Sequence, residues 1–397
     1  MRKSKENENS VLRSFQERKE MERRFSKLLL LFALAVFSTV LRRITILPSV
    51  EGQSSGSPVS AFFILGDSSV NCGDNFFFYP YLPRNSSSYL CNTSDRRLIP
   101  DFLAEKMGLP MVPSFYSQNR TLEGLLGGLN FGSSPATIMN WGGAIYQGLN
   151  QQLGQAFETL QLLQLQLGIE KAREVAQSSL FYLSIGKDDY IEFLRDPDGI
   201  RERHGPHKFA RMLVNQVTRV VKDLYNANVR KIICMGIEPL GCTPRSLWQA
   251  CNATTCAHDR CIDTINGLIV EYNTMLSMDL LGLNQQLPNA QIVFCDLYRG
   301  MMAMIMDPKS YGFDDVSSAC CGLGRYGGRV GCVSRQLACG ERARHVWWDL
   351  YNPTEAANQL LADWMWSGSS LDICHPITVQ QLASAPARTV ARTPCHQ

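Results

Sequence analysis

The amino-acid sequence predicts an α/β fold in which a central parallel sheet is covered by helices on both faces. Four short apolar runs have the length and composition of buried parallel strands, at residues 61–65, 180–185, 231–235 and 291–295. Helical stretches separate these runs, and in two of them apolar residues recur at helical spacing, from Phe209 to Leu224 and from Ile262 to Leu280. Sheets of this kind collect ligands at the carboxyl ends of their strands.

The composition is that of a globular protein with one large core. The 397 residues are 45% hydrophobic and 19% charged. Residues 1–43 contain eleven Lys or Arg and five Glu, a net charge of +6, so the rest of the chain contributes −3 to the total of +3. Because the body of the chain is not basic, nucleic acid is not expected as a partner.

The amino terminus has the features of a targeting signal. Arg23, Arg24 and Lys27 precede an apolar run over residues 28–41. This run has the length of a signal peptide and is shorter than the roughly 20 residues that span a bilayer. We therefore interpret residues 1–58 as a targeting segment with a linker, and predict secretion without a stable membrane span. A signal anchor in the endomembrane system is the alternative.

The cysteines and the glycan acceptor sites agree with the secretory route. Asn-x-Ser/Thr sequences place acceptors at Asn85, Asn92, Asn119 and Asn252. The chain has 14 cysteines, and no Cys-x-x-Cys pair recurs at the spacing of a zinc site. Disulfides in an oxidising compartment are therefore the favoured use, with their connectivity open, and neither a metal nor a cofactor is expected.

Four segments with chemically useful residues occur in a fixed order. Gly66-Asp67-Ser68 follows the first strand, and the others cover residues 128–136, 184–190 and 348–354. Together with the stretches 97–102, 236–244 and 319–322, this ordered set resembles the plant-type GDSL lipase/esterase family of SGNH hydrolases, from about residue 61 to 366. Each motif alone is weak, but their order is specific.

The resemblance implies a flavodoxin-like three-layer α/β/α domain that hydrolyses acyl esters or lipids through a serine. We expect this domain to occupy residues 59–370 and a loosely ordered tail to occupy residues 371–397. Ser68 matches the nucleophile, and its backbone N–H would also serve the oxyanion hole. Asp349 matches the acid that orients the catalytic histidine. A turn serine that caps the following helix is the alternative role for Ser68.

Three positions depart from the family pattern. Pro135 stands in place of the loop glycine whose N–H binds the oxyanion, and proline has no N–H. Asp188 replaces the oxyanion asparagine, which puts a negative charge beside a developing negative charge. Asn352 replaces the histidine, and an amide has no useful basicity. We therefore expect impaired catalysis. The alternative is an active esterase or lipase that uses Ser68 with a non-standard base, for which His345 is the candidate nearest to Asp349 in sequence.

Structural roles are also available to these residues. Asn352 followed by Pro353 fits the start of the next helix as its cap. Asp188 could likewise act as a cap, or form an exposed pair with a basic neighbour such as Lys187. The aromatic residues at 76–81 are expected to pack in the core rather than to line a lipid pocket. The oligomeric state is not indicated by the sequence.

Overall fold

A five-stranded sheet forms the centre of the fold, in the order β1-β2-β3-β4-β7. The first four strands are parallel, and β7 runs antiparallel to β4 at the edge. Their bounds are β1 Phe62–Gly66, β2 Leu180–Ser184, β3 Lys231–Met235, β4 Gln291–Cys295 and β7 Cys374–His375. The four predicted parallel strands are thus confirmed, each to within one residue.

The computed structural model describes residues 59–70, 97–117, 121–139, 147–195, 199–250, 261–368 and 371–386. The targeting segment, the four glycan acceptors and the aromatic cluster at 76–81 lie outside these residues. Within the described ranges, no helix combines the length and the apolarity needed to cross a bilayer.

A further stretch, residues 127–133, runs along the free edge of β1. The N–H of Ile64 donates to the carbonyl of Leu129, and the N–H of Phe131 donates back to Ile64. Counted by its place in the chain, this stretch comes second, so the parallel elements lie in the order 2-1-3-4-5, that of flavodoxin-like folds. The loop that follows it is thereby carried to the carboxyl end of β1.

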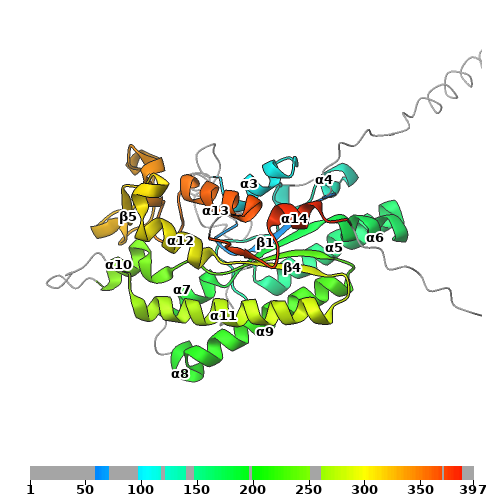
Figure 1. Ribbon diagram of the computed structural model, residues 1–397, viewed down its shortest axis with the longest axis horizontal. Helices are drawn as coiled ribbons and strands as arrows, with labels where there is room; N and C mark the ends of the chain where they lie inside the picture. The colour runs from blue at the N-terminus through cyan, green and yellow to red at the C-terminus, as the bar shows by residue number, and fades with distance from the viewer. Residues whose placement is uncertain are drawn as a thin grey trace, which may run out of the picture. The chain divides into compact units, whose positions relative to one another are not determined.

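The two faces of the sheet bury separate apolar clusters. Because side chains alternate along a strand, Phe63 and Leu65 of β1 belong to one cluster, and Phe62 and Ile64 belong to the other. One face is covered by α5 Leu149–Leu167, α6 Ile169–Ser178, α7 Lys187–Arg195, α9 Pro206–Asn226 and α11 Asp263–Gln286. The other is covered by α3 Ile99–Lys106, α12 Leu297–Met306, α13 Glu355–Ser367 and α14 Val379–Ser384. Figure 1 shows both layers, and the predicted α/β/α fold is confirmed.

The two helices expected from their apolar spacing are α9 and α11. In α9, Phe209, Leu213 and Val217 are buried, as the spacing predicts. Each such side chain stabilises the fold by roughly 1.5–3 kcal/mol relative to leaving it in water. The apolar stripes are therefore core, not ligand contacts.

Shorter elements complete the described structure. The helices are α4 Leu122–Leu126, α8 Ile200–His204 and α10 Pro244–Ala250, and β5 Asp315–Ala319 pairs with β6 His345–Trp347 in a second, two-stranded sheet. Single helical turns lie at η2 Phe115–Ser117, η3 Leu240–Cys242, η4 Pro308–Tyr311, η5 Arg325–Gly327, η6 Arg335–Leu337 and η7 Arg342–Arg344.

The expected use of cysteines in disulfides is confirmed. Four bonds join described cysteines: Cys242–Cys261, Cys295–Cys374, Cys320–Cys339 and Cys321–Cys332. Cys234, on β3, is a buried free thiol.

The prediction of a loosely ordered tail is wrong for residues 371–386. Cys374 bonds to Cys295 and lies in β7, and α14 buries Val379 and Leu382 against the sheet. The short run from Val379 to Ala383 has the apolar spacing of a helix. This spacing is enough for α14 to form and pack once a disulfide holds the preceding strand in place.

Candidate functional site

Ser68 lies just beyond the carboxyl end of β1, against the neighbouring β2. Gly66 allows this close approach, because a Cβ there would lie 2.3 Å from the carbonyl oxygen of Ser184. Asp67 fixes the turn: its fully buried carboxylate accepts the N–H groups of Gly186 at 3.0 Å and Lys187 at 2.9 Å. The turns after β1 and β2 are therefore tied together.

All five residues predicted for the site line one cavity of about 420 Å³. They are Ser68, Pro135, Asp188, Asp349 and Asn352. The other lining residues come from the loop before Pro135, from α7, from the disulfide-bonded region after β5 and from the loop after β6: Ser134, Ile191, Glu192, Arg195, Gly331, Cys332, Val333, Leu350 and Tyr351.

The Asp188 carboxylate holds the groups that would take part in acyl transfer. Its Oδ1 accepts the hydroxyl of Ser68 at 2.7 Å. Its Oδ2 accepts two backbone N–H groups, from Ala136 at 3.0 Å and from Ser68 at 3.3 Å. Two N–H groups that converge on one oxygen are what an oxyanion hole offers to a tetrahedral intermediate. In this protein a carboxylate oxygen occupies that place.

Asn352 is held between Asp349 and Lys187. Its Nδ2 donates to both carboxylate oxygens of Asp349 at 3.0 Å, and its Oδ1 accepts the Lys187 ammonium at 2.8 Å. The ammonium also lies 3.3 Å from Glu238 Oε1, and the side chains of this ion pair are 2% and 5% exposed. These four residues form a polar chain, buried at Lys187 and Glu238 and half-buried at Asp349 and Asn352, where a serine hydrolase has its acid and its histidine.

The whole domain matches a known family. Residues 62–365 match the GDSL-like lipase/acylhydrolase family. The chain belongs to this family of ester hydrolases. A GDSL esterase/lipase of Arabidopsis thaliana is 32% identical over 92% of this chain and 98% of its own length. GDSL esterase/lipase 7 of Arabidopsis thaliana is 30% identical over 81% of this chain and 92% of its own length.

In this GDSL protein the donor expected to be lost at Pro135 is supplied by its neighbour. Pro135 itself has no N–H, but the next N–H, of Ala136, points at the same oxygen as the N–H of Ser68. The loop therefore still presents a donor. The departure that changes the oxyanion hole of this GDSL protein is the acidic side chain at 188.

The structural roles predicted for Asp188 and Asn352 are wrong. Asp188 is 5% exposed and binds Ser68 and Ala136, so it forms no exposed pair with Lys187. The helix α13 begins at Glu355 and is capped by Thr354, whose side chain accepts the N–H of Ala357 at 3.3 Å. Asn352 lies before this cap, and its amide is already used by Asp349 and Lys187.

The environment of Asp188 changes its proton affinity. Burial, and next the nearby Asp67 carboxylate, raise the pKa of Asp188 to about 7, although Lys187 and the bonds from Ser68 and Ala136 act in the opposite direction. Burial alone would lower the pKa of Lys187, but Glu238, Asp67, Asp188 and Asp349 together raise it above its usual value. Lys187 is therefore an ammonium ion and not a base for Ser68.

This environment makes stability depend on pH. Since the pKa of Asp188 is about 7 in the native state and near 3.8 when unfolded, its contribution to stability is full below about pH 4 and is lost as the pH rises through 7. We expect Asp188→Asn to remove this loss and to gain about 1–3 kcal/mol of unfolding free energy relative to the native protein between pH 5 and pH 8. Urea denaturation at both pH values measures this gain in unfolding free energy, with Asp223→Asn, whose side chain is 39% exposed, as control. If the native protein and the variant differ in unfolding free energy by the same amount at pH 5 and at pH 8, the raised pKa assigned to Asp188 is wrong.

No histidine of the described residues lines the cavity at Ser68. His345 lies on β6, with Nδ1 3.9 Å from Asp315 Oδ2. His207 contacts Glu271, and His375 contacts Ser277. Within the described ranges, the replacement base considered from the sequence is thus not at the site.

Three residues that contact the predicted site residues, Glu238 through Lys187, were not assigned to the site by the sequence analysis: Ala136, Lys187 and Glu238. Lys187 directly precedes Asp188 in the segment 184–190, and Glu238 lies inside the matched stretch 236–244. The signal that could have pointed to Lys187 and Glu238 is a lysine directly beside the oxyanion position together with a glutamate in another matched stretch.

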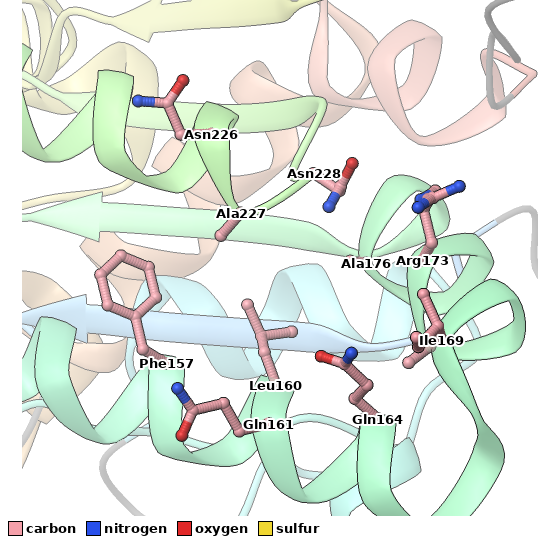
Figure 2. A pocket seen from close by; sticks show the side chains of 11 residues that line it. Phe157, Leu160, Gln161, Gln164, Ile169, Arg173, Ala176, Asn226, Ala227 and Asn228 are labelled. Atoms are coloured by element: carbon pink, nitrogen blue, oxygen red, sulfur yellow. The ribbon is translucent and has the colours of Figure 1, made fainter.

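A second cavity, of about 470 Å³, lies near the amino ends of the parallel strands, whereas Ser68 lies at their carboxyl ends. It is formed by α5, α6 and the end of α9, and α6 and α9 lead directly into the amino ends of β2 and β3. Figure 2 shows that apolar side chains, including Phe157 and Leu160, and amide side chains, Gln161, Gln164 and Asn228, line it together. It contains none of the predicted site residues and is separate from Ser68.

Proposed function

We propose that this GDSL-family protein is a secreted protein with the fold of an ester hydrolase and impaired catalysis. The observation that carries the proposal is the position of Asp188, whose carboxylate binds the Ser68 hydroxyl and both N–H groups of the oxyanion hole. An ester carbonyl could use these donors only after displacing the carboxylate. Its oxygen would then gain negative charge beside an acid group.

The missing base adds to this effect. Attack by Ser68 needs a group that takes its proton, and Asn352 supplies only an amide, which is held between Asp349 and Lys187. In a comparable serine hydrolase, loss of the histidine costs about 10⁶ in turnover. The cavity beside Ser68 remains large enough for a small acyl ester or a lipid segment, so ligand binding is the activity that we propose to be retained.

The secretory part of the proposal rests on the chain outside the described residues and on the disulfides. The apolar run at 28–41 and the four glycan acceptors fit export, and four disulfides require an oxidising compartment to persist. Recovery of a glycosylated product from the culture medium of a eukaryotic host would support this part.

The test of impaired catalysis compares the purified native protein with Ser68→Ala. We expect the two to hydrolyse short-chain acyl esters at the same rate, within about twofold, because an unassisted serine contributes little above background. Covalent labelling by a fluorophosphonate reports the reactivity of Ser68 directly. Native turnover that depends on Ser68 and exceeds the Ser68→Ala rate by about 10²-fold or more would overturn the proposal.

One observation favours an active enzyme as a second candidate function. Asp188 Oδ1 lies 2.7 Å from Ser68 Oγ, and its pKa of about 7 suits a general base. In this case Asp188 would take the Ser68 proton, and turnover would rise with pH through about 7. Asp188→Asn separates the two candidates. It abolishes turnover if Asp188 is the base, whereas it preserves or increases fluorophosphonate labelling if Asp188 obstructs the oxyanion hole.

A further inference from the structure

The disulfide-bonded region between β5 and β6 stands beside the candidate site. Two bonds, Cys320–Cys339 and Cys321–Cys332, hold it together, and its residues Gly331, Cys332 and Val333 form part of the cavity wall. Figure 1 shows β5 at one end of the sheet, away from the long helices α9 and α11. The pairing of β1 with β2 and of β2 with β3 in the main sheet involves no residue of this region.

Large apolar side chains are exposed in this region. Eleven such side chains are exposed in the described part of the chain, and four of them fall between residues 323 and 337: Leu323, Val330, Val333 and Leu337, at 44%, 42%, 61% and 48%. Leu323 and Val330 form an antiparallel bridge, so their side chains stand on the same side of the backbone. Exposed apolar groups gathered in this way mark an interaction surface more often than scattered ones do.

The same region is strongly basic. Residues 323–344 contain five arginines and a single acidic residue, Glu341, a net charge of +4. Arg325 and Arg329 are exposed, and neither forms an ion pair with any described residue, whereas Arg344 pairs with Asp314 at 2.6 Å. Arg329 extends along Gly324, because a Cβ at that glycine would lie 2.7 Å from the Cβ of Arg329. Arg329 directly precedes Val330 of the bridged apolar pair in the chain.

We propose that this apolar–basic patch, formed by Leu323, Arg325, Arg329, Val330, Val333 and Leu337, docks the protein on an anionic lipid surface. Arginines attract acidic headgroups, while aliphatic side chains enter the boundary between headgroups and acyl chains. An acidic polysaccharide would account for the arginines only, because it offers nothing apolar to bury. The aliphatic side chains therefore favour the lipid.

The position of the patch connects docking to the candidate site. Val333 is the most exposed of the four apolar side chains in the patch, and it also lines the cavity that holds Ser68. A lipid surface bound at the patch thus meets the rim of that cavity. Docking itself does not require turnover, so this inference stands whether or not Ser68 is reactive.

Vesicle binding tests the proposal with the full chain expressed in a eukaryotic secretory host. The native protein is expected to bind vesicles containing about one third phosphatidylserine at least tenfold more tightly than vesicles of phosphatidylcholine alone. Arg325→Gln with Arg329→Gln should weaken this binding by about 30-fold. Leu323→Ser with Leu337→Ser should weaken it by about tenfold without changing its salt dependence.

A matched control removes two exposed arginines elsewhere. Arg203→Gln with Arg219→Gln changes the net charge equally on α8 and α9 and should leave binding unchanged. All variants share the same amino-terminal segment, so differences among them report on the patch, and their thermal unfolding temperatures verify folding. Equal binding to both kinds of vesicle, or equal losses in the control, would overturn the proposal. So would binding to soluble polygalacturonate without binding to vesicles, which would indicate an acidic polysaccharide.

Discussion

Replacing Asp188 by asparagine and Asn352 by histidine together is expected to raise Ser68-dependent ester hydrolysis by at least about 10³-fold over the native protein. The first change frees the N–H groups of Ser68 and Ala136 from the carboxylate that now occupies them. The second supplies a base beside Asp349, whose carboxylate already accepts the backbone and side-chain N–H groups of residue 352. Initial rates with a short-chain acyl ester measure the gain.

The single variants divide the effect between its two causes. Asp188→Asn alone should increase fluorophosphonate labelling of Ser68 and leave turnover low, because no base is present. Asn352→His alone should increase the rate of ester hydrolysis only slightly, because the Asp188 carboxylate still occupies the oxyanion donors. Adding Pro135→Gly to the pair should change the rate by less than about threefold, since Ala136 already supplies the loop donor.

Two controls make the restoration experiment decisive. Ser68→Ala in the restored background must abolish the gain, which shows that the gain is not general base catalysis by the new histidine. The urea unfolding midpoint of each variant verifies the fold. If the restored protein folds and binds ester but hydrolyses no faster than the native protein, then Asp188 and Asn352 are not what limits catalysis.

The sequence predicted the sheet well because the signal for buried parallel strands is local. Each of the four apolar runs has the right length and is followed by polar or glycine residues, so β1 to β4 could be placed before any contact was known. Their carboxyl ends then fixed where Ser68 and Asp188 must meet. The chemistry at this edge followed from residue types alone, since an aspartate cannot donate and a proline lacks an N–H.

The contacts that the sequence could not predict span long separations. Lys187 and Asn352 are 165 positions apart, and their bond removes Asn352 from the role of helix cap. Both Asn352 and Thr354 are good capping residues, so local preference could not decide between them. Likewise, the sequence indicated that Asp188 would repel an oxyanion, but not that its carboxylate would take the place of one. Only the fold brings Ala136 within 3.0 Å of that carboxylate.

Replacing Lys187 by methionine is expected to lower the unfolding free energy by about 3–5 kcal/mol. The substitution leaves Glu238, with its side chain 5% exposed, as a buried charge without its counter-ion. Glu238 Oε1 has no hydrogen-bond partner in the described structure, so the Lys187 ammonium at 3.3 Å is what offsets its burial. Urea denaturation at pH 7 measures the loss.

The double variant Lys187→Met with Glu238→Leu should recover part of this loss, because it removes the unpaired Glu238 charge. The recovery is incomplete because Asn352 Oδ1 still loses the ammonium that donates to it. The resulting coupling energy in a double-mutant cycle should be at least about 2 kcal/mol. The exposed pair Lys171–Glu174, at 65% and 63% exposure, provides the contrast: Lys171→Met should cost less than about 1 kcal/mol. A Lys187→Met variant as stable as the native protein would mean that Glu238 takes up a proton or reaches water. The Lys187 ammonium would then not be what offsets the burial of Glu238.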